Sequence, residues 1–106
     1  MTMSLENFIW HDGNIHSLSY SIQSTGASLE IEGEFYSSNE SNKRDIYKIK
    51  CNDVSRFNNI IDFKETLDNF SAGSVSNGYI KDNTLWLYLS DGIIEIQAKS
   101  INVSKH

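Results

Sequence analysis

Hydrophobic and polar residues alternate along most of the chain, which is the pattern of β-strands that bury one face. In residues 17–22, serines alternate with Leu18, Tyr20 and Ile22, so one side is apolar and the other carries hydroxyls. Residues 28–36 repeat the alternation with glutamates on the polar side. Because successive side chains of a strand point to opposite faces, we expect both segments to be half-buried strands.

Residues 44–51 also alternate, and the sequence predicts how they pair with residues 28–36. The wholly polar stretch 37–42 between these segments predicts a hairpin loop. One register matches charge with charge and apolar with apolar in these pairs: Glu30–Lys50, Glu32–Lys48, Leu29–Cys51, Ile31–Ile49 and Gly33–Tyr47. A register shifted by one pair gives Glu32–Lys50 and Glu34–Lys48 and keeps the same matching. Both registers remain open on the sequence.

One segment changes to the period of a helix. Its apolar residues recur at helical spacing: Phe63, Leu67 and Phe70. We expect a short helix near 62–71, with Asp62 as its N-cap and Glu65 as the reciprocal partner of that cap. Gly73 lies just beyond its end, where a left-handed residue commonly stops a helix. A helix of this length must pack its apolar stripe on a sheet to be stable.

The last third of the chain returns to strands. Asn77-Gly78 and residues 81–84 are turn signals, and residues 85–89 ("LWLYL") are apolar on both faces, as in a central strand. Asp91-Gly92 predicts a tight hairpin turn. The apolar phase of the return strand then shifts, from Ile94, Ile96 and Ala98 to Ile101 and Val103. A bulge near Lys99-Ser100 would explain the shift.

These elements together predict a mostly β domain of the α+β class that spans residues 1–106. We expect an antiparallel β-sandwich or half-open barrel of about six to eight strands, closed by the short helix near 62–71. A length of 106 residues suits one domain rather than two.

The charge of the chain restricts its partners. Fourteen acidic residues against nine basic ones give a net charge of −5, which argues against binding to nucleic acid. The same charge suits a basic protein partner. The chain has no apolar run long enough to span a membrane and no pattern of a signal peptide, and it has one cysteine. We therefore expect a cytoplasmic protein that binds neither nucleic acid nor membrane.

Two histidines and a carboxylate lie close together in residues 10–16, "WHDGNIH". His11, Asp12 and His16 are donor types that zinc uses, but a zinc site needs three or four converging ligands. A polar turn explains the stretch without a metal, because Asp12 can accept backbone N–H bonds and residues 13–14 tolerate positive φ. We predict a turn here, with no metal and no cofactor.

The sequence offers little for catalysis. Cys51 falls on the apolar side of its strand, where a thiol behaves as a small hydrophobe. The serines form no nucleophile elbow, and no glycine loop could hold a phosphate. We therefore expect a protein that is not an enzyme.

The aromatic residues allow two interpretations. Trp86 and Tyr88 share one face of residues 85–89, and packing within the sheet or core is the simpler explanation. The alternative is a small-ligand-binding barrel or sandwich module, with a pocket lined by Trp86, Tyr88 or Tyr79.

The order of the segments resembles a known group of proteins. "WHDGNI", a Glu-rich strand, "IYKIKCNDVSRF", a short helix, "SNGYI" and "LWLYLSDGIIEIQA" follow one another along the chain. This order is similar to that of small cytosolic bacterial immunity proteins encoded beside secreted toxins, including those of contact-dependent growth inhibition systems. The resemblance covers most of the chain and rests on size, acidity and strand pattern, so it transfers no functional residue. It implies a non-catalytic protein that binds one toxin domain, often a nuclease, and blocks its active site.

Such a partner would be basic, and an acidic surface would speed association with it. We expect the binding residues among the surface acids and a few exposed anchors: Glu30, Glu32, Glu34, Tyr36, Asp53, Arg56, Asp62, Glu65, Asp68 and Tyr79. The three glutamates of residues 28–36 project from one strand face, but lysines on the neighbouring strand would neutralise most of that row. We expect the chain itself to be a monomer or a weak homodimer.

Overall fold

The computed structural model describes residues 2–3, 8–36, 42–61, 74–90 and 92–105. Within these ranges all regular structure is β-strand, which confirms the mostly β prediction. The strands are β1 (Thr2–Met3), β2 (Ile9–Gln23), β3 (Gly26–Tyr36), β4 (Asp45–Ile61), β5 (Val75–Lys81), β6 (Thr84–Leu89) and β7 (Gly92–Lys105). The helix predicted near 62–71 lies outside the described residues.

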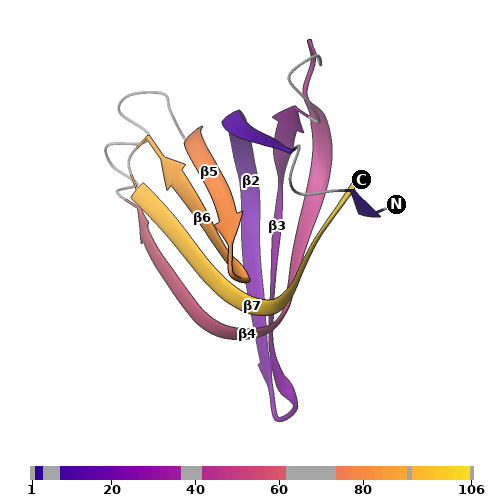
Figure 1. Cartoon of the computed structure of the whole chain (residues 1–106), viewed down its shortest axis with the longest axis vertical. Helices are drawn as coiled ribbons and strands as arrows, with labels where there is room; N and C mark the ends of the chain where they lie inside the picture. The colour runs from indigo at the N-terminus through magenta and orange to yellow at the C-terminus, as the bar shows by residue number, and fades with distance from the viewer. Residues whose placement is uncertain (1, 4–7, 37–41, 62–73, 91, 106) are drawn as a thin grey trace.

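The strands form one antiparallel sheet that curls into a half-open barrel (Figure 1). Its order is β2-β3-β4-β7-β6-β5, and β1 pairs with β7 beside this path. The curl brings β5, at one end of the order, against β2 at the other, where Asn14 and Ser74 form an isolated bridge. Of the two predicted architectures, the structure therefore adopts the half-open barrel and not the sandwich.

The predicted hairpin of β3 and β4 is confirmed, with its register. Glu30 lies opposite Lys50 and Ile31 opposite Ile49, so the shifted alternative is wrong. The side chains of β3 follow the expected alternation, with residues 29, 31, 33 and 35 buried and the glutamates between them half-buried. Period-two patterning excludes a slip of one residue, which would turn every buried side chain to the other face, but a slip of two residues keeps the alternation.

The core fills the concave side of the sheet with alternate residues of the long strands. An aromatic group lies at its centre: the Phe8 ring is 4.8 Å from Trp10, 5.5 Å from Phe35 and 5.1 Å from Tyr47, centroid to centroid. The remaining buried apolar residues are Leu29, Ile31, Ile49, Cys51, Val75, Leu85, Leu87, Ile94, Ile96, Ala98 and Val103.

The predicted phase shift in β7 is confirmed, but the bulge was placed on the wrong strand. The register with β4 is the same on both sides of Lys99, and the irregularity lies in β4, between Val54 and Arg56. Asp53, just before it, has a φ of 53°. Bulges increase the local twist and bend of a strand. β4 and β7 bend together at the base of the half-barrel (Figure 1).

The turn signals of the last third have mixed outcomes. Asp82 and Asn83, both with positive φ, form the two-residue turn of the β5–β6 hairpin, as predicted. The β6–β7 hairpin is also confirmed, although Gly92 pairs with Leu89 as the first residue of β7. Asn77-Gly78 is not a turn and lies within β5. No helix among the described residues is long and apolar enough to cross a membrane.

Candidate functional site

The histidine-containing segment at residues 10–16 is a bulged part of β2 and not the predicted turn. Residues 10–13 lie between the pairs Ile9–Tyr36 and Asn14–Glu34. On β3 only one residue, Phe35, lies between the same two pairs, so β2 has extra residues here. Asp12 takes the positive φ, at 63°. Gly13 is buried against the Phe35 ring, which leaves no room for a Cβ there. The stretch is therefore shaped by close packing of β2 on the core.

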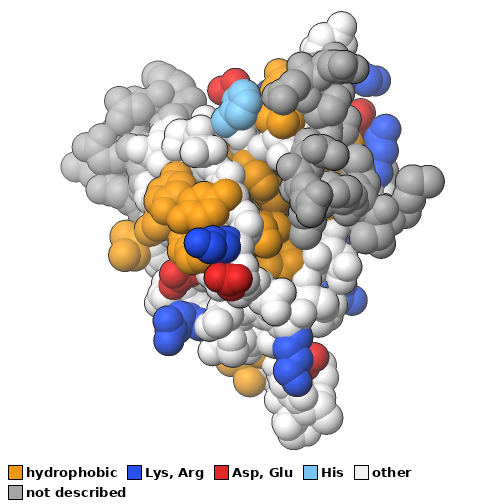
Figure 2. All heavy atoms as spheres, in the orientation of Figure 1, with side chains coloured by type: hydrophobic (Ala, Val, Ile, Leu, Met, Phe, Trp, Pro, Cys, Tyr) orange, Lys and Arg blue, Asp and Glu red, His pale blue; other side chains and the backbone are white. Residues whose placement is uncertain are grey.

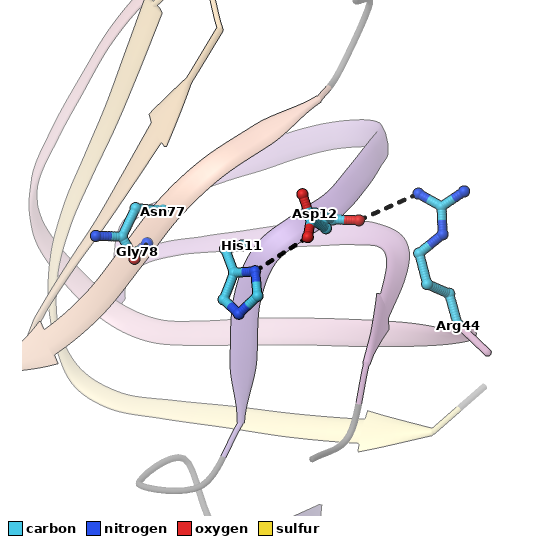
Figure 3. Close-up of polar contacts among 5 residues, drawn as sticks. All are labelled: His11, Asp12, Arg44, Asn77 and Gly78. Atoms are coloured by element: carbon cyan, nitrogen blue, oxygen red, sulfur yellow. Dashed lines mark hydrogen bonds and ion pairs between the residues drawn. The ribbon is translucent and has the colours of Figure 1, made fainter. Parts of the chain in front are cut away.

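The polar atoms of this segment have separate partners (Figure 3). Nδ1 of His11 lies 3.2 Å from Oδ2 of Asp12, and the Asp12 carbonyl accepts a 3.3 Å hydrogen bond from Nη1 of Arg44. Nε2 of His16 lies 3.2 Å from Oε2 of Glu34. Across the described residues, no three His, Cys, Asp or Glu side chains are grouped so as to hold a metal ion.

The glutamates of β3 lie on the outer side of the sheet, where two of them have a lysine opposite on the neighbouring strand. Glu30 and Glu32 lie opposite Lys50 and Lys48 on β4, while Glu34 contacts His16. Opposite charges that face each other across a ladder attract weakly and cancel much of each other's field. This surface is therefore of mixed charge and does not form the acidic stripe that a basic partner would need.

A second surface lies on the outer face of β5 and β6. Leu85 and Leu87 point into the core, so Trp86 and Tyr88 point away from it and lie beside Tyr79 of β5. The Tyr79 ring stacks on Trp86 at 4.7 Å and 24°, and on Tyr88 at 6.2 Å and 23°. The simpler sequence interpretation was packing within the sheet or core: core packing is wrong for Trp86 and Tyr88, which pack instead on Tyr79 of the neighbouring strand.

Isoleucines of the neighbouring strands extend this surface. Tyr88 pairs across the sheet with Ile93 of β7, which in turn pairs with Ile60 of β4. Tyr79 is 43% exposed and Ile60 is 71% exposed. We call these five residues the aromatic face: Ile60, Tyr79, Trp86, Tyr88 and Ile93. On the side shown in Figure 2, hydrophobic side chains gather over β5 and β6 with charged side chains beside them.

A carboxylate of β7 fixes the indole of this face. Glu95 accepts a 3.0 Å hydrogen bond from Nε1 of Trp86 on one oxygen and a 2.8 Å bond from Nδ2 of Asn58 on the other. The bonds from Asn58 and Trp86, in that order, lower the pKa of Glu95, and the nearby charge of Arg56 adds to the effect. The pKa of Tyr88 is raised, chiefly by its hydrogen bond with Tyr79.

The structure brings only part of the predicted binding set to this face. Tyr79 belongs to it, and Arg56 lies one cross-strand row away, opposite Gln97. Asp53 lies in β4 just before the bulge, and the predicted residues of β3 lie elsewhere on the sheet: Glu30, Glu32, Glu34 and Tyr36. Asp62, Glu65 and Asp68 lie outside the described residues.

Four members of the aromatic face were not predicted as partner-binding residues: Ile60, Trp86, Tyr88 and Ile93. Tyr88 was considered, together with Trp86, only as the lining of a ligand pocket. The signal was present in "LWLYL", because a strand that is apolar at every position must turn some apolar side chains away from the core unless both faces are covered.

Two pockets lie near the candidate residues. One, of about 650 Å³, is lined by Phe8, Trp10 and residues 78–83. The other, of about 320 Å³, lies between the β2–β3 hairpin and β4 and is mainly apolar; Tyr20, Leu29 and Phe57 are among its lining residues. Of the three aromatic residues predicted for a ligand pocket, Tyr79 lines the larger pocket, and Trp86 and Tyr88 line neither of these two.

No family model, curated protein or solved structure matches the chain.

Proposed function

We propose that the chain is a non-catalytic protein-binding domain that uses the aromatic face. In its most specific form, it is a cytoplasmic immunity protein that binds a toxin domain and blocks the active site of that toxin. The observation that carries the proposal is the stacked, partly exposed group of Tyr79, Trp86 and Tyr88 on a sheet surface turned away from the core. Tyrosine and tryptophan are the residues most enriched in the energetic centres of protein interfaces.

The geometry of the rings favours a protein over a sugar or a nucleic acid base. Sugars and bases stack on a ring face, but the Tyr79 ring already stacks on both neighbours. Tyr79 therefore offers a partner its ring edge and hydroxyl rather than a free ring face. Rigid apolar edges with polar tips suit a protein surface, because they bury area at little cost in side-chain entropy.

The indole is held in place before a partner arrives. Its bond to Glu95, and the bond of Asn58 to the same carboxylate, limit the rotamers of Trp86. Pre-ordering of an interface side chain saves about 0.5–1.5 kcal/mol of the entropy that binding would otherwise cost. The net charge of −5 adds long-range attraction to a basic domain, such as a toxin that binds phosphates.

The experiment first asks whether a reading frame next to this one encodes a toxin domain, and then measures the affinity of the chain for that domain and the protection that the chain gives against it. We expect the wild-type chain to bind that domain and to rescue bacterial cells that express it. Tyr79→Ala and Tyr88→Ala should each weaken binding about tenfold or more, measured by surface plasmon resonance. Ile46→Ala is the control, since Ile46 is a large apolar residue that is 39% exposed on a different part of the sheet, opposite Glu34.

The association rate should also fall as salt rises from low to physiological concentration. Equal affinity of Tyr79→Ala, Tyr88→Ala and the wild type would refute the role of the aromatic face. Absence of both binding and protection would refute the immunity function.

One observation favours the small-ligand module as a second candidate. The pocket beside Trp10 and Tyr79 has a volume of about 650 Å³, within the range of about 300–1,000 Å³ typical of ligand sites. In Trp86→Phe, Trp10 is the only tryptophan left in the chain. Saturable energy transfer from Trp10 to the dye 8-anilinonaphthalene-1-sulfonate would support this candidate, and its absence would count against it.

A further inference from the structure

Among the described residues, the second half of β2 has a neighbouring strand on one side only. The bridge between Asn14 and Ser74 marks where β5 meets β2, and beyond it the described pairs of β2 are with β3 alone. In Figure 1 the β2–β3 hairpin extends past the bend of β4 and β7. Residues Ser17–Gln23 therefore form an open edge among the described strands.

This edge lacks the features that usually prevent strands from pairing. Residues Ser17–Gln23 contain neither a charged residue nor a proline, although charges make up 22% of the chain. Their serines lie on the outer side. On the inner side, Tyr20 is 63% exposed and Ile22 is 77% exposed. An uncharged edge with exposed apolar side chains favours addition of another strand.

We propose that the Ser17–Gln23 edge pairs antiparallel with the same segment of a second copy of this chain. A two-fold axis at Tyr20 matches each residue with one of its own kind. Tyr20 faces Tyr20 of the second copy, and the other opposed positions are Leu18 with Ile22, Ser19 with Ser21 and Ser17 with Gln23. Apolar side chains then meet on the inner side and hydroxyls on the outer side, with no pair of like charges.

The sheet topology makes this assembly a closed dimer. A two-fold contact uses the same edge of both copies, so it leaves that edge with no further partner. The other end of the sheet, β5, curls back against the first half of β2. The apolar pocket of about 320 Å³ lies beside the open edge, where the Tyr20 ring is 6.0 Å from Phe57. The second copy would cover this exposed apolar surface.

Disulfide trapping tests the proposed register. Directly opposed residues of antiparallel strands have Cα atoms about 4.5–5.5 Å apart, within the range that a disulfide spans. Tyr20→Cys should therefore form a disulfide-linked dimer under mild oxidation. Ile22→Cys is the matched control: its side chain is more exposed, but the two copies of residue 22 would be four residues out of register, about 13 Å apart.

The native thiol does not interfere with this test. Cys51 is fully buried, and burial raises its pKa to about 12. A dimer from Tyr20→Cys together with little or none from Ile22→Cys supports the proposal. Equal crosslinking of the two variants, or none from Tyr20→Cys, overturns it.

Sedimentation velocity tests the same contact without oxidation. The wild type should dimerise with rising concentration, and more strongly at high salt, because salt screens the repulsion between two acidic chains. Ser19→Lys with Ser21→Lys sets lysine opposite lysine and should weaken the dimer at least tenfold. Ser19→Lys with Ser21→Glu sets lysine opposite glutamate and should restore it.

A wild type that stays monomeric up to about 1 mM would overturn the proposal, as would equal dissociation constants of the two double variants. The result is independent of the aromatic face, which lies on other strands. Toxin binding should also respond to salt in the opposite direction, so failure of one proposal is distinguishable from failure of the other.

Discussion

Trp86 and Glu95 are joined across the β6–β7 ladder by a 3.0 Å hydrogen bond from the indole Nε1 to Oε2. The other carboxylate oxygen accepts from Asn58 of β4 at 2.8 Å. Three adjacent strands therefore contribute to one polar chain beneath the aromatic face. These hydrogen bonds link the orientation of the Trp86 indole to the ionisation of the Glu95 carboxylate.

Loss of the Asn58 bond should raise the pKa of Glu95. Hydrogen bonds to the charged form hold this pKa below its ordinary value of 4.5, and the bond from Asn58 contributes most. A lowered pKa adds stability above pH 4.5, and this stability disappears as the pH falls through the lowered pKa. We expect Asn58→Ala to raise the pKa toward 4.5 in an NMR titration of the side-chain carboxyl carbon. Asn59→Ala, its neighbour on the other face of β4, should leave it unchanged.

A methyl group at Gly78 should destabilise the closure of β5 against β2. A Cβ at this position would lie 2.8 Å from Cδ2 of Leu87 and 2.9 Å from Cβ and Cγ of Trp10. Overpacking of this kind typically costs about 1–3 kcal/mol. Gly78→Ala should lower the free energy of unfolding by that amount in urea denaturation. Lys81→Ala, at the exposed end of the same strand, should change it by less than about 0.5 kcal/mol.

Two isoleucines on adjacent strands should respond differently to truncation. Ile31 of β3 is fully buried, whereas Ile22 of β2 is 77% exposed. Ile31→Ala removes core contacts and leaves a cavity, which should cost about 2–5 kcal/mol of unfolding free energy. Ile22→Ala should cost less than about 0.5 kcal/mol in the monomer, measured by denaturation at low protein concentration. Similar losses for both variants would contradict the orientation of the two strands.

The burial of Cys51 should make the chain less stable at high pH. Burial raises the pKa of this thiol from 9.0 to about 12. The unfolded chain therefore loses its proton first, so stability is unaffected below pH 9.0 and falls as the pH rises toward 12. We expect this fall in denaturation curves of the wild type and a smaller one in Cys51→Ala. Iodoacetamide at pH 8 should modify Cys51 only through unfolding, and fast labelling of the folded chain would argue against its burial.

The β3–β4 hairpin shows how far the sequence alone could go. Alternation told which residues of each strand face the core, and the pairing of Glu30 with Lys50 is one of two registers that fit both charge and burial. The choice between them belongs to the tertiary structure, because Glu34 is matched by His16 of β2 rather than by Lys48. The alternation within β3 and β4 carries no information about β2, the strand that supplies His16.

Three other predictions failed for a related reason. Gly13 and Gly78 were interpreted as parts of turns, but both lie within strands, where a large ring approaches the backbone: Phe35 at Gly13 and Trp10 at Gly78. Glycine serves either purpose, and only the fold shows which one applies. The bulge was assigned to β7 because the phase shift is visible there, whereas the extra residue is in β4.

For the candidate site too, the sequence determined some features and the tertiary structure decided the others. Composition and period two determined a β-rich, acidic chain with a central strand at residues 85–89, because side-chain alternation is a local property of the backbone. Whether Trp86 faces the core or the outside depends on which face of the sheet is concave, and its stacking on Tyr79 and bond to Glu95 depend on strand order. Strand order and curvature arise from contacts between residues far apart in the chain, so only the tertiary structure decided where the aromatic face lies.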